Sequence, residues 1–116
     1  MRVGAVISDL MLYSRIESAA SAAGASLVRV DSPTELPNDL DLVLVDWSVR
    51  APGWSSALAS WRAGARESRL IVFGPHTDLE AQADARYASL GPMWARSRLV
   101  LHLAELLGPD RQKGPR

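Results

Sequence analysis

The stretch "DLVLVDWS", residues 41–48, decides the fold. Its four consecutive apolar residues, Leu42 to Val45, are typical of a strand in a parallel sheet that helices cover on both faces. The run ends at Asp46, and a tryptophan follows. Because open α/β sheets place their chemistry at the carboxyl ends of strands, the sequence predicts either a functional carboxylate at Asp46 or a cap for the next segment.

Strands and helices alternate along the rest of the chain. The predicted strands cover residues 3–8, 26–30, 41–46, 69–74 and 92–95. The predicted helices have N-caps at Ser8 or Asp9, at Thr77 in capping-box spacing with Glu80, and at Ser97, with a further helix over 54–64; they end at Gly24, Gly64, Gly91 and Gly108. This alternation predicts a doubly wound α/β domain with a parallel sheet.

The connection between the second and third predicted strands is too short for an ordinary helix. It reads "DSPTELPNDL", residues 31–40, and Pro37 prevents a second helical turn. We therefore expect one turn at most, which leaves one face of the sheet thinly covered. Trp54 and Trp61 share a helix face at a spacing more typical of core than of a binding site, and one indole could fill this gap or meet a partner.

Composition limits the classes of function. The chain has 116 residues, 47% of them apolar, and equal numbers of basic and acidic residues, 13 of each, so neither nucleic acid nor an anionic membrane is an expected partner. There is no cysteine, which excludes thiolate catalysis and fits the cytoplasm. No apolar run approaches the ~18 residues of a membrane span. We expect a cytoplasmic domain over 1–108 and a disordered tail over 109–116.

Five strands alternating with helices, with an aspartate ending the third, resemble the receiver domain of bacterial response regulators. The resemblance covers residues 1–108 and implies a CheY-like, flavodoxin-like sheet of order 2-1-3-4-5, here with a shortened or missing second helix. In that family an acidic pair ends strand one, an aspartate ending strand three accepts phosphate, a Ser or Thr ends strand four, and a Lys ends strand five.

Part of this site is present in the sequence. Asp46 matches the phospho-acceptor, and the backbone carbonyl of Ser48 falls at a position that ligates magnesium in the family. Strand one ends in Ser8 and Asp9 where the family has two acids. The resemblance therefore implies at most a weak Mg²⁺ site made of Asp9, Asp46 and Ser48, and Asp9 has the alternative role of a helix cap.

The positions that transmit the signal in receivers are changed. Gly74 stands where the family has a hydroxyl, and Met93 replaces the aromatic residue that precedes the lysine. Arg96 replaces the lysine itself, and we interpret it as an ion-pair partner that holds Asp46 in place rather than as a catalytic group. The loop after Asp46 reaches Pro52 two residues later than is usual in the family.

These departures favour a stand-alone pseudo-receiver, a signalling domain that is not an enzyme, needs no cofactor and acts by protein–protein interaction without phosphorylation. The alternative is an active single-domain response regulator that accepts phosphate on Asp46 with Mg²⁺ in a two-component phosphorelay. A nucleotide-binding or enzymatic domain is a third hypothesis, but the turn after the first strand lacks the glycine fingerprint.

The final helix carries more apolar residues than one buried stripe requires. Receivers commonly pair through helix four, strand five and helix five. The resemblance therefore implies an interaction face, for a protein partner or a homodimer, made of Trp94, Val100, Leu103 and Leu107.

Overall fold

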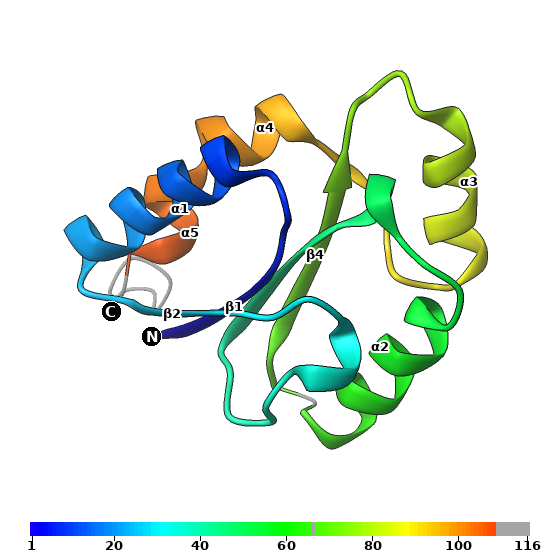
Figure 1. Ribbon diagram of the computed structural model, residues 1–116, viewed down its shortest axis with the longest axis horizontal. Helices are drawn as coiled ribbons and strands as arrows, with labels where there is room; N and C mark the ends of the chain where they lie inside the picture. Colours follow the sequence, from blue (N-terminus) through cyan, green and yellow to red (C-terminus); the bar gives the residue numbers. More distant parts are fainter. Residues whose placement is uncertain (66, 109–116) are drawn as a thin grey trace.

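A computed structural model describes residues 1–65 and 67–108 as a sheet with helices on both faces (Figure 1). The five strands are β1 (Arg2–Val6), β2 (Ser26–Arg29), β3 (Leu42–Asp46), β4 (Arg69–Gly74) and β5 (Trp94–Ala95). All neighbouring strands are parallel, and their order is β2-β1-β3-β4-β5. The structure confirms the predicted fold class and strand order. The tail predicted over 109–116 lies outside the described residues.

Strand β3 is the centre of the sheet, paired with β1 on one side and β4 on the other. All five of its residues are buried. Because side chains alternate along a strand, Leu42 and Leu44 pack into one core layer while Val43 and Val45 pack into the other. The continuous apolar run therefore serves two cores, as its composition predicted.

The helices divide between the two faces (Figure 1). One face is covered by α1 (Leu10–Ala23), α4 (Arg96–Leu101) and α5 (Leu103–Leu107); the other is covered by α2 (Trp54–Gly64) and α3 (Leu79–Tyr87). Of the two predicted N-caps of α1, Ser8 and Asp9, the structure has Asp9, and the C-cap is Gly24, whose φ of 75° is the left-handed geometry that favours glycine.

The short connection between β2 and β3 forms a single turn, η1 (Pro33–Glu35), as predicted. The hydroxyl of Ser32 caps it by accepting a hydrogen bond from the backbone N–H of Thr34. Helix α2 compensates for the missing helix: Trp54 and Trp61 are 9% and 5% exposed and pack with Leu36 and Leu40 of this connection. The structure places both indoles in the core.

The Trp61 indole also has a polar role. Its Nε1–H donates to the carbonyl oxygen of Pro37 at 2.8 Å, which ties α2 to the short connection. A buried indole N–H needs such a hydrogen-bond acceptor. Pro37, the residue that prevents a second helical turn, supplies it through its backbone carbonyl.

The structure corrects both ends of α3. The capping box predicted at Thr77 and Glu80 is wrong, because the N-cap is Asp78, whose carboxylate accepts from the backbone N–H of Ala81 at 3.0 Å. The helix ends at Tyr87, before Gly91. The left-handed residue that terminates it is Ser89, with φ 59°.

The last helix also differs from its prediction. It begins at Arg96, with Ala95 as N-cap, so Ser97 lies inside the helix and does not cap it. The backbone departs from helical geometry at His102, which separates α4 from α5. Strand β5 has only two residues of the predicted four. Within the described residues, no helix is both long and apolar enough to span a membrane.

Candidate functional site

Asp46 lies at the carboxyl end of β3 and is 1% exposed. It is the one charged residue that is buried among those described. Its Oδ1 accepts two hydrogen bonds from Ser48, from the backbone N at 3.1 Å and from the hydroxyl at 2.6 Å. Asp46 thereby caps the short turn η2 (Trp47–Val49), so one carboxylate oxygen is engaged by the element that follows β3.

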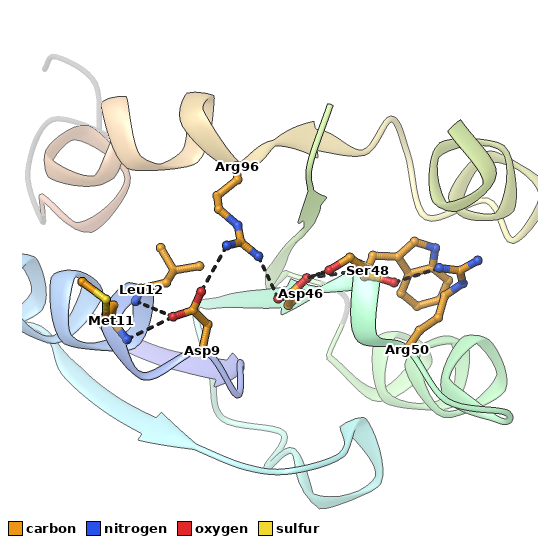
Figure 2. Close-up of polar contacts among 8 residues, drawn as sticks. Asp9, Met11, Leu12, Asp46, Ser48, Arg50 and Arg96 are labelled. Carbon is orange, nitrogen blue, oxygen red and sulfur yellow. Dashed lines mark hydrogen bonds and ion pairs between the residues drawn. The ribbon is translucent and has the colours of Figure 1, made fainter. Parts of the chain in front are cut away.

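Asp9 lies just beyond β1 and presents its two oxygens in different directions. Oδ1 accepts from the backbone N–H groups of Met11 at 3.0 Å and Leu12 at 3.2 Å, which caps α1. Oδ2 points away from the helix toward Arg96 (Figure 2). The structure therefore confirms the capping role and adds an ion pair to it.

Arg96 follows β5 directly and bridges the two carboxylates. Its Nη1 lies 3.1 Å from Asp9 Oδ2, and its Nη2 lies 3.4 Å from Asp46 Oδ2 (Figure 2). The predicted pairing with Asp46 is present. Since Arg96 is 37% exposed at its side chain and Asp46 only 2%, the guanidinium closes the site toward solvent.

The residues at this edge do not fit the magnesium site that the fold suggests. No group of three or more His, Asp or Glu side chains that could hold a metal ion occurs within residues 1–65 and 67–108. Ser8 supplies no second carboxylate beside Asp9, and a guanidinium lies between the two carboxylates that are present. Magnesium prefers six oxygen ligands. Here the carboxylate oxygens of Asp9 and Asp46 already accept hydrogen bonds from Arg96, from Ser48 and from the backbone at the start of α1.

Gly74 and Met93 lie together beside the site. Gly74 ends β4 as predicted, and a Cβ atom at this position would lie 3.2 Å from Met93 Sδ and 3.5 Å from Ser48 Cβ. The thioether of Met93 therefore occupies the space next to the position where receivers carry a hydroxyl. Gly74 has no side chain and so offers no hydroxyl to contact a group attached to Asp46.

The predicted interaction face needs correction. Trp94 and Val100 are partly exposed, but Leu103 is 6% exposed and Leu107 is fully buried in the core beneath α1 and α5. The break at His102 starts a new helix whose leucines point at the sheet. Leu103 and Leu107 are thus core residues and cannot form a contact surface.

Sequence reasoning missed the contacts of Arg50. Its Nε pairs with Asp84 of α3 at 2.5 Å, its Nη1 donates to the carbonyl oxygen of Trp47 at 3.0 Å, and its guanidinium lies 5.5 Å from the Trp47 ring. These contacts fasten the loop after Asp46 to α3. Arg50 and Asp84 are 34 residues apart, and nothing in the local sequence pattern relates them.

Solved structures of receiver domains share this fold. A response regulator receiver domain protein from Clostridium thermocellum matches with a TM-score of 0.63 and 15% identity over 97% of this chain and 96% of that chain. The receiver domain of a Francisella response regulator matches with a TM-score of 0.64 and 14% identity over 97% of this chain and 98% of that chain. A CheY-like response regulator receiver domain protein from Methanospirillum hungatei matches with a TM-score of 0.66 and 14% identity over 97% of this chain and 98% of that chain.

No protein-family model matches the chain. No curated protein matches its sequence. In each comparison the structural likeness covers nearly the full length of both chains, and it establishes that this chain has the receiver fold. At 14 to 15% identity it extends to the fold alone, and the function is argued from the site.

Proposed function

We propose that this domain is a receiver-like signalling module of the pseudo-receiver type, a cytoplasmic, non-enzymatic protein that acts by binding other proteins without phosphorylation of Asp46. One observation carries the proposal: Arg96 is paired with both Asp9 and Asp46, while Ser48 engages the remaining oxygen of Asp46. The carboxylate that becomes phosphorylated in receiver domains has a structural role here, since it holds Arg96 and Ser48 in place.

Phosphoryl transfer to Asp46 would have to overcome this arrangement. The nucleophilic oxygen must be free to attack in line, and charge on the transferred group must be stabilised by metal and cation. Both Asp46 oxygens have partners and the residue is 1% exposed, so attack requires that Ser48 or Arg96 move away.

Signal transmission lacks a structural basis as well. A phosphoryl group shifts a conformational equilibrium only if it binds one conformation better than the other. Gly74 offers it no hydroxyl, and Met93 offers no aromatic ring that could rotate. The proposal therefore assigns signalling to the surface of the domain and not to chemistry at Asp46.

The test is a titration of intrinsic tryptophan fluorescence with Mg²⁺, with and without beryllofluoride, comparing wild type with Asp46→Asn. Trp47 is 1% exposed and adjacent to Asp46, so its emission reports on the site. We expect no saturable change in either protein. A saturable, Asp46-dependent change would instead establish the active phosphorelay regulator.

A gain-of-function variant provides the matched control. The triple change Ser8→Asp, Gly74→Ser and Arg96→Lys restores the acid, the hydroxyl and the compact cation of the family pattern. We expect this variant to respond to Mg²⁺ and beryllofluoride in the same assay, while far-UV circular dichroism verifies that all three proteins are folded.

A further inference from the structure

A cluster of cationic and aromatic side chains lies at the β5 edge of the sheet, away from Asp46. Trp94 is partly exposed on β5, and the guanidinium carbon of Arg98 lies 3.8 Å from its ring centre. The guanidinium of Arg69, at the start of β4, lies 5.8 Å from the same ring. The His102 ring approaches edge-on, with centres 6.3 Å apart. We call these four residues the Trp94 cluster.

The two arginines of the cluster differ in their pairing from four other arginines of the described residues. Arg2, Arg29, Arg50 and Arg96 each pair with an aspartate. Within residues 1–65 and 67–108, no carboxylate pairs with Arg69 or Arg98. Their guanidinium groups lie near an aromatic ring, which orients them, and in the part of the chain that the structure describes their five N–H donors have no carboxylate acceptor.

The cluster lines a hollow of about 300 Å³ together with Glu105 and Leu106. Among the described residues that line it, Glu105 is the one acidic residue, and its carboxylate lies 2.8 Å from His102 Nδ1. The hollow lies at an edge of the sheet, because β5 is the outermost strand and pairs with β4 at only two positions. A ligand can therefore reach it without displacing a strand.

We propose that the Trp94 cluster binds an acidic segment of a partner protein, with a carboxylate held between Arg69 and Arg98 and the adjoining apolar atoms resting on Trp94. This inference rests on the proposed function and deepens it by naming the chemistry of the partner. Guanidinium groups hold carboxylates by paired, charge-assisted hydrogen bonds, and an indole beside them supplies the apolar contact area common at interface anchors.

The charge distribution favours a carboxylate-bearing peptide over a nucleic acid. A phosphate backbone is bound by many basic groups along an extended stripe. Here the chain has 13 basic and 13 acidic residues, and the hollow contains Glu105 beside the two arginines. Two arginines that line one hollow suit one or two carboxylates of a short segment.

The test uses the full chain labelled with ¹⁵N and an oligoglutamate peptide at low ionic strength. Four tryptophans give four indole N–H signals, and Trp94→Phe identifies the one from Trp94. We expect the peptide to move the Trp94 signal in a saturable way while the signals of the core residues Trp54 and Trp61 stay in place.

Charge variants define the binding groups. Arg98→Gln should lower the affinity for the peptide about fivefold, which corresponds to the loss of one charge-assisted contact of roughly 1 kcal/mol. Arg69→Gln should act in the same direction and serves as the second variant if Arg98→Gln fails to fold. The matched control is Arg62→Gln, an exposed arginine on α2 at the opposite face, which should leave the affinity unchanged.

Three results would overturn the site: an unmoved Trp94 signal, equal affinity in Arg98→Gln and Arg62→Gln, or tighter binding of an oligothymidylate than of oligoglutamate. Repeating the titration with Mg²⁺ and beryllofluoride separates this inference from the proposed function. Binding that occurs only with beryllofluoride would contradict phosphorylation independence but support the site. Absence of binding under both conditions would remove the site and leave the proposed function to the fluorescence assay.

Discussion

At the scale of single residues, Arg96 organises the carboxyl edge of the sheet, because its two terminal nitrogens reach acids that follow different strands. Asp46 is nearly inaccessible, so its charge depends on this guanidinium and on the donors of Ser48 for stabilisation. A buried carboxylate without a cation is strongly destabilising, whereas an exposed ion pair contributes little. The Arg96–Asp46 pair is intermediate, since only Asp46 is buried.

We predict that Arg96→Gln lowers the free energy of unfolding by about 1–2 kcal/mol, between the values typical of exposed and buried pairs. Asp46→Asn removes the charge that needs the cation. The double variant should therefore lose less stability than the sum of the two single variants. Urea denaturation of all four proteins measures this coupling.

The exposed Arg62 again provides the control, and Arg62→Gln should change stability by less than about 0.5 kcal/mol. Strictly additive losses in the Arg96 and Asp46 variants would mean that the two side chains do not interact in solution.

Part of this residue-scale arrangement could be predicted. The capping role of Asp9 follows from its position before an apolar periodic segment, and the pairing of Arg96 with Asp46 follows from the family resemblance, which puts Arg96 in the place of the lysine. The hydroxyl contact from Ser48 and the Arg50–Asp84 pair depend on side-chain rotamers and loop geometry, which no local pattern specifies.

At the scale of elements, the short connection containing η1 changes how the sheet is covered. Leu36 and Leu40 of this connection are buried against β1 and α2, where a full helix would otherwise pack. Gly4 on β1 makes this close approach possible: a Cβ there would lie 2.6 Å from Leu40 Cδ1 and 3.2 Å from Leu36 Cδ2. The connection can lie directly on the strand because that strand has no side chain at this point.

We predict that Gly4→Ala destabilises the protein by about 1–3 kcal/mol, the usual cost of overpacking a core. The expectation follows because Leu40 is 3% exposed, so its side chain can move only by displacing other core residues. Thermal or urea unfolding of the variant provides the measurement.

Gly64→Ala is the matched control, because the nearest atoms to a Cβ at the end of α2 lie 3.8 Å away or more. It should be neutral or stabilising by up to about 1 kcal/mol, since alanine is the better helix former. If both variants behave alike, the tight contact between β1 and the connection is not present in solution.

Element boundaries were less predictable than element types. Thr77 and Asp78 are both good capping residues, and Gly91 is a common helix stop, so the sequence alone could not select among neighbours. In the structure Asp78 caps the helix and Ser89 has the left-handed backbone after its end, while Ala81 and Ala85 on the helix are buried in the core.

At the scale of the whole molecule, two core layers share one sheet. The layer beneath α2 and α3 contains Trp47, Trp54 and Trp61, whereas Trp94 packs at the margin of the layer beneath α1, α4 and α5. Strand β3 contributes to both layers. Loss of either layer exposes one face of β3, so we expect the two layers to unfold together.

We predict that Leu44→Ala, which opens a cavity in the layer beneath α1, lowers stability by about 2–5 kcal/mol. The midpoint of the tryptophan fluorescence transition should fall as far as that of far-UV circular dichroism, although three of the four indoles lie in the other layer. Two separate midpoints would show that the layers unfold independently.

The sequence by itself determined the elements and, through a family resemblance, their order, because apolar periodicity, caps and prolines act locally. It also determined which chemical groups stand at the strand ends. The tertiary structure alone decided that Leu103 and Leu107 are core, that Arg50 pairs with Asp84, and that Arg69 and Arg98 both lie near the Trp94 ring. The physical reason is distance along the chain. Arg50 and Asp84 are 34 positions apart, and a contact of that range exists only once packing has brought the two elements together.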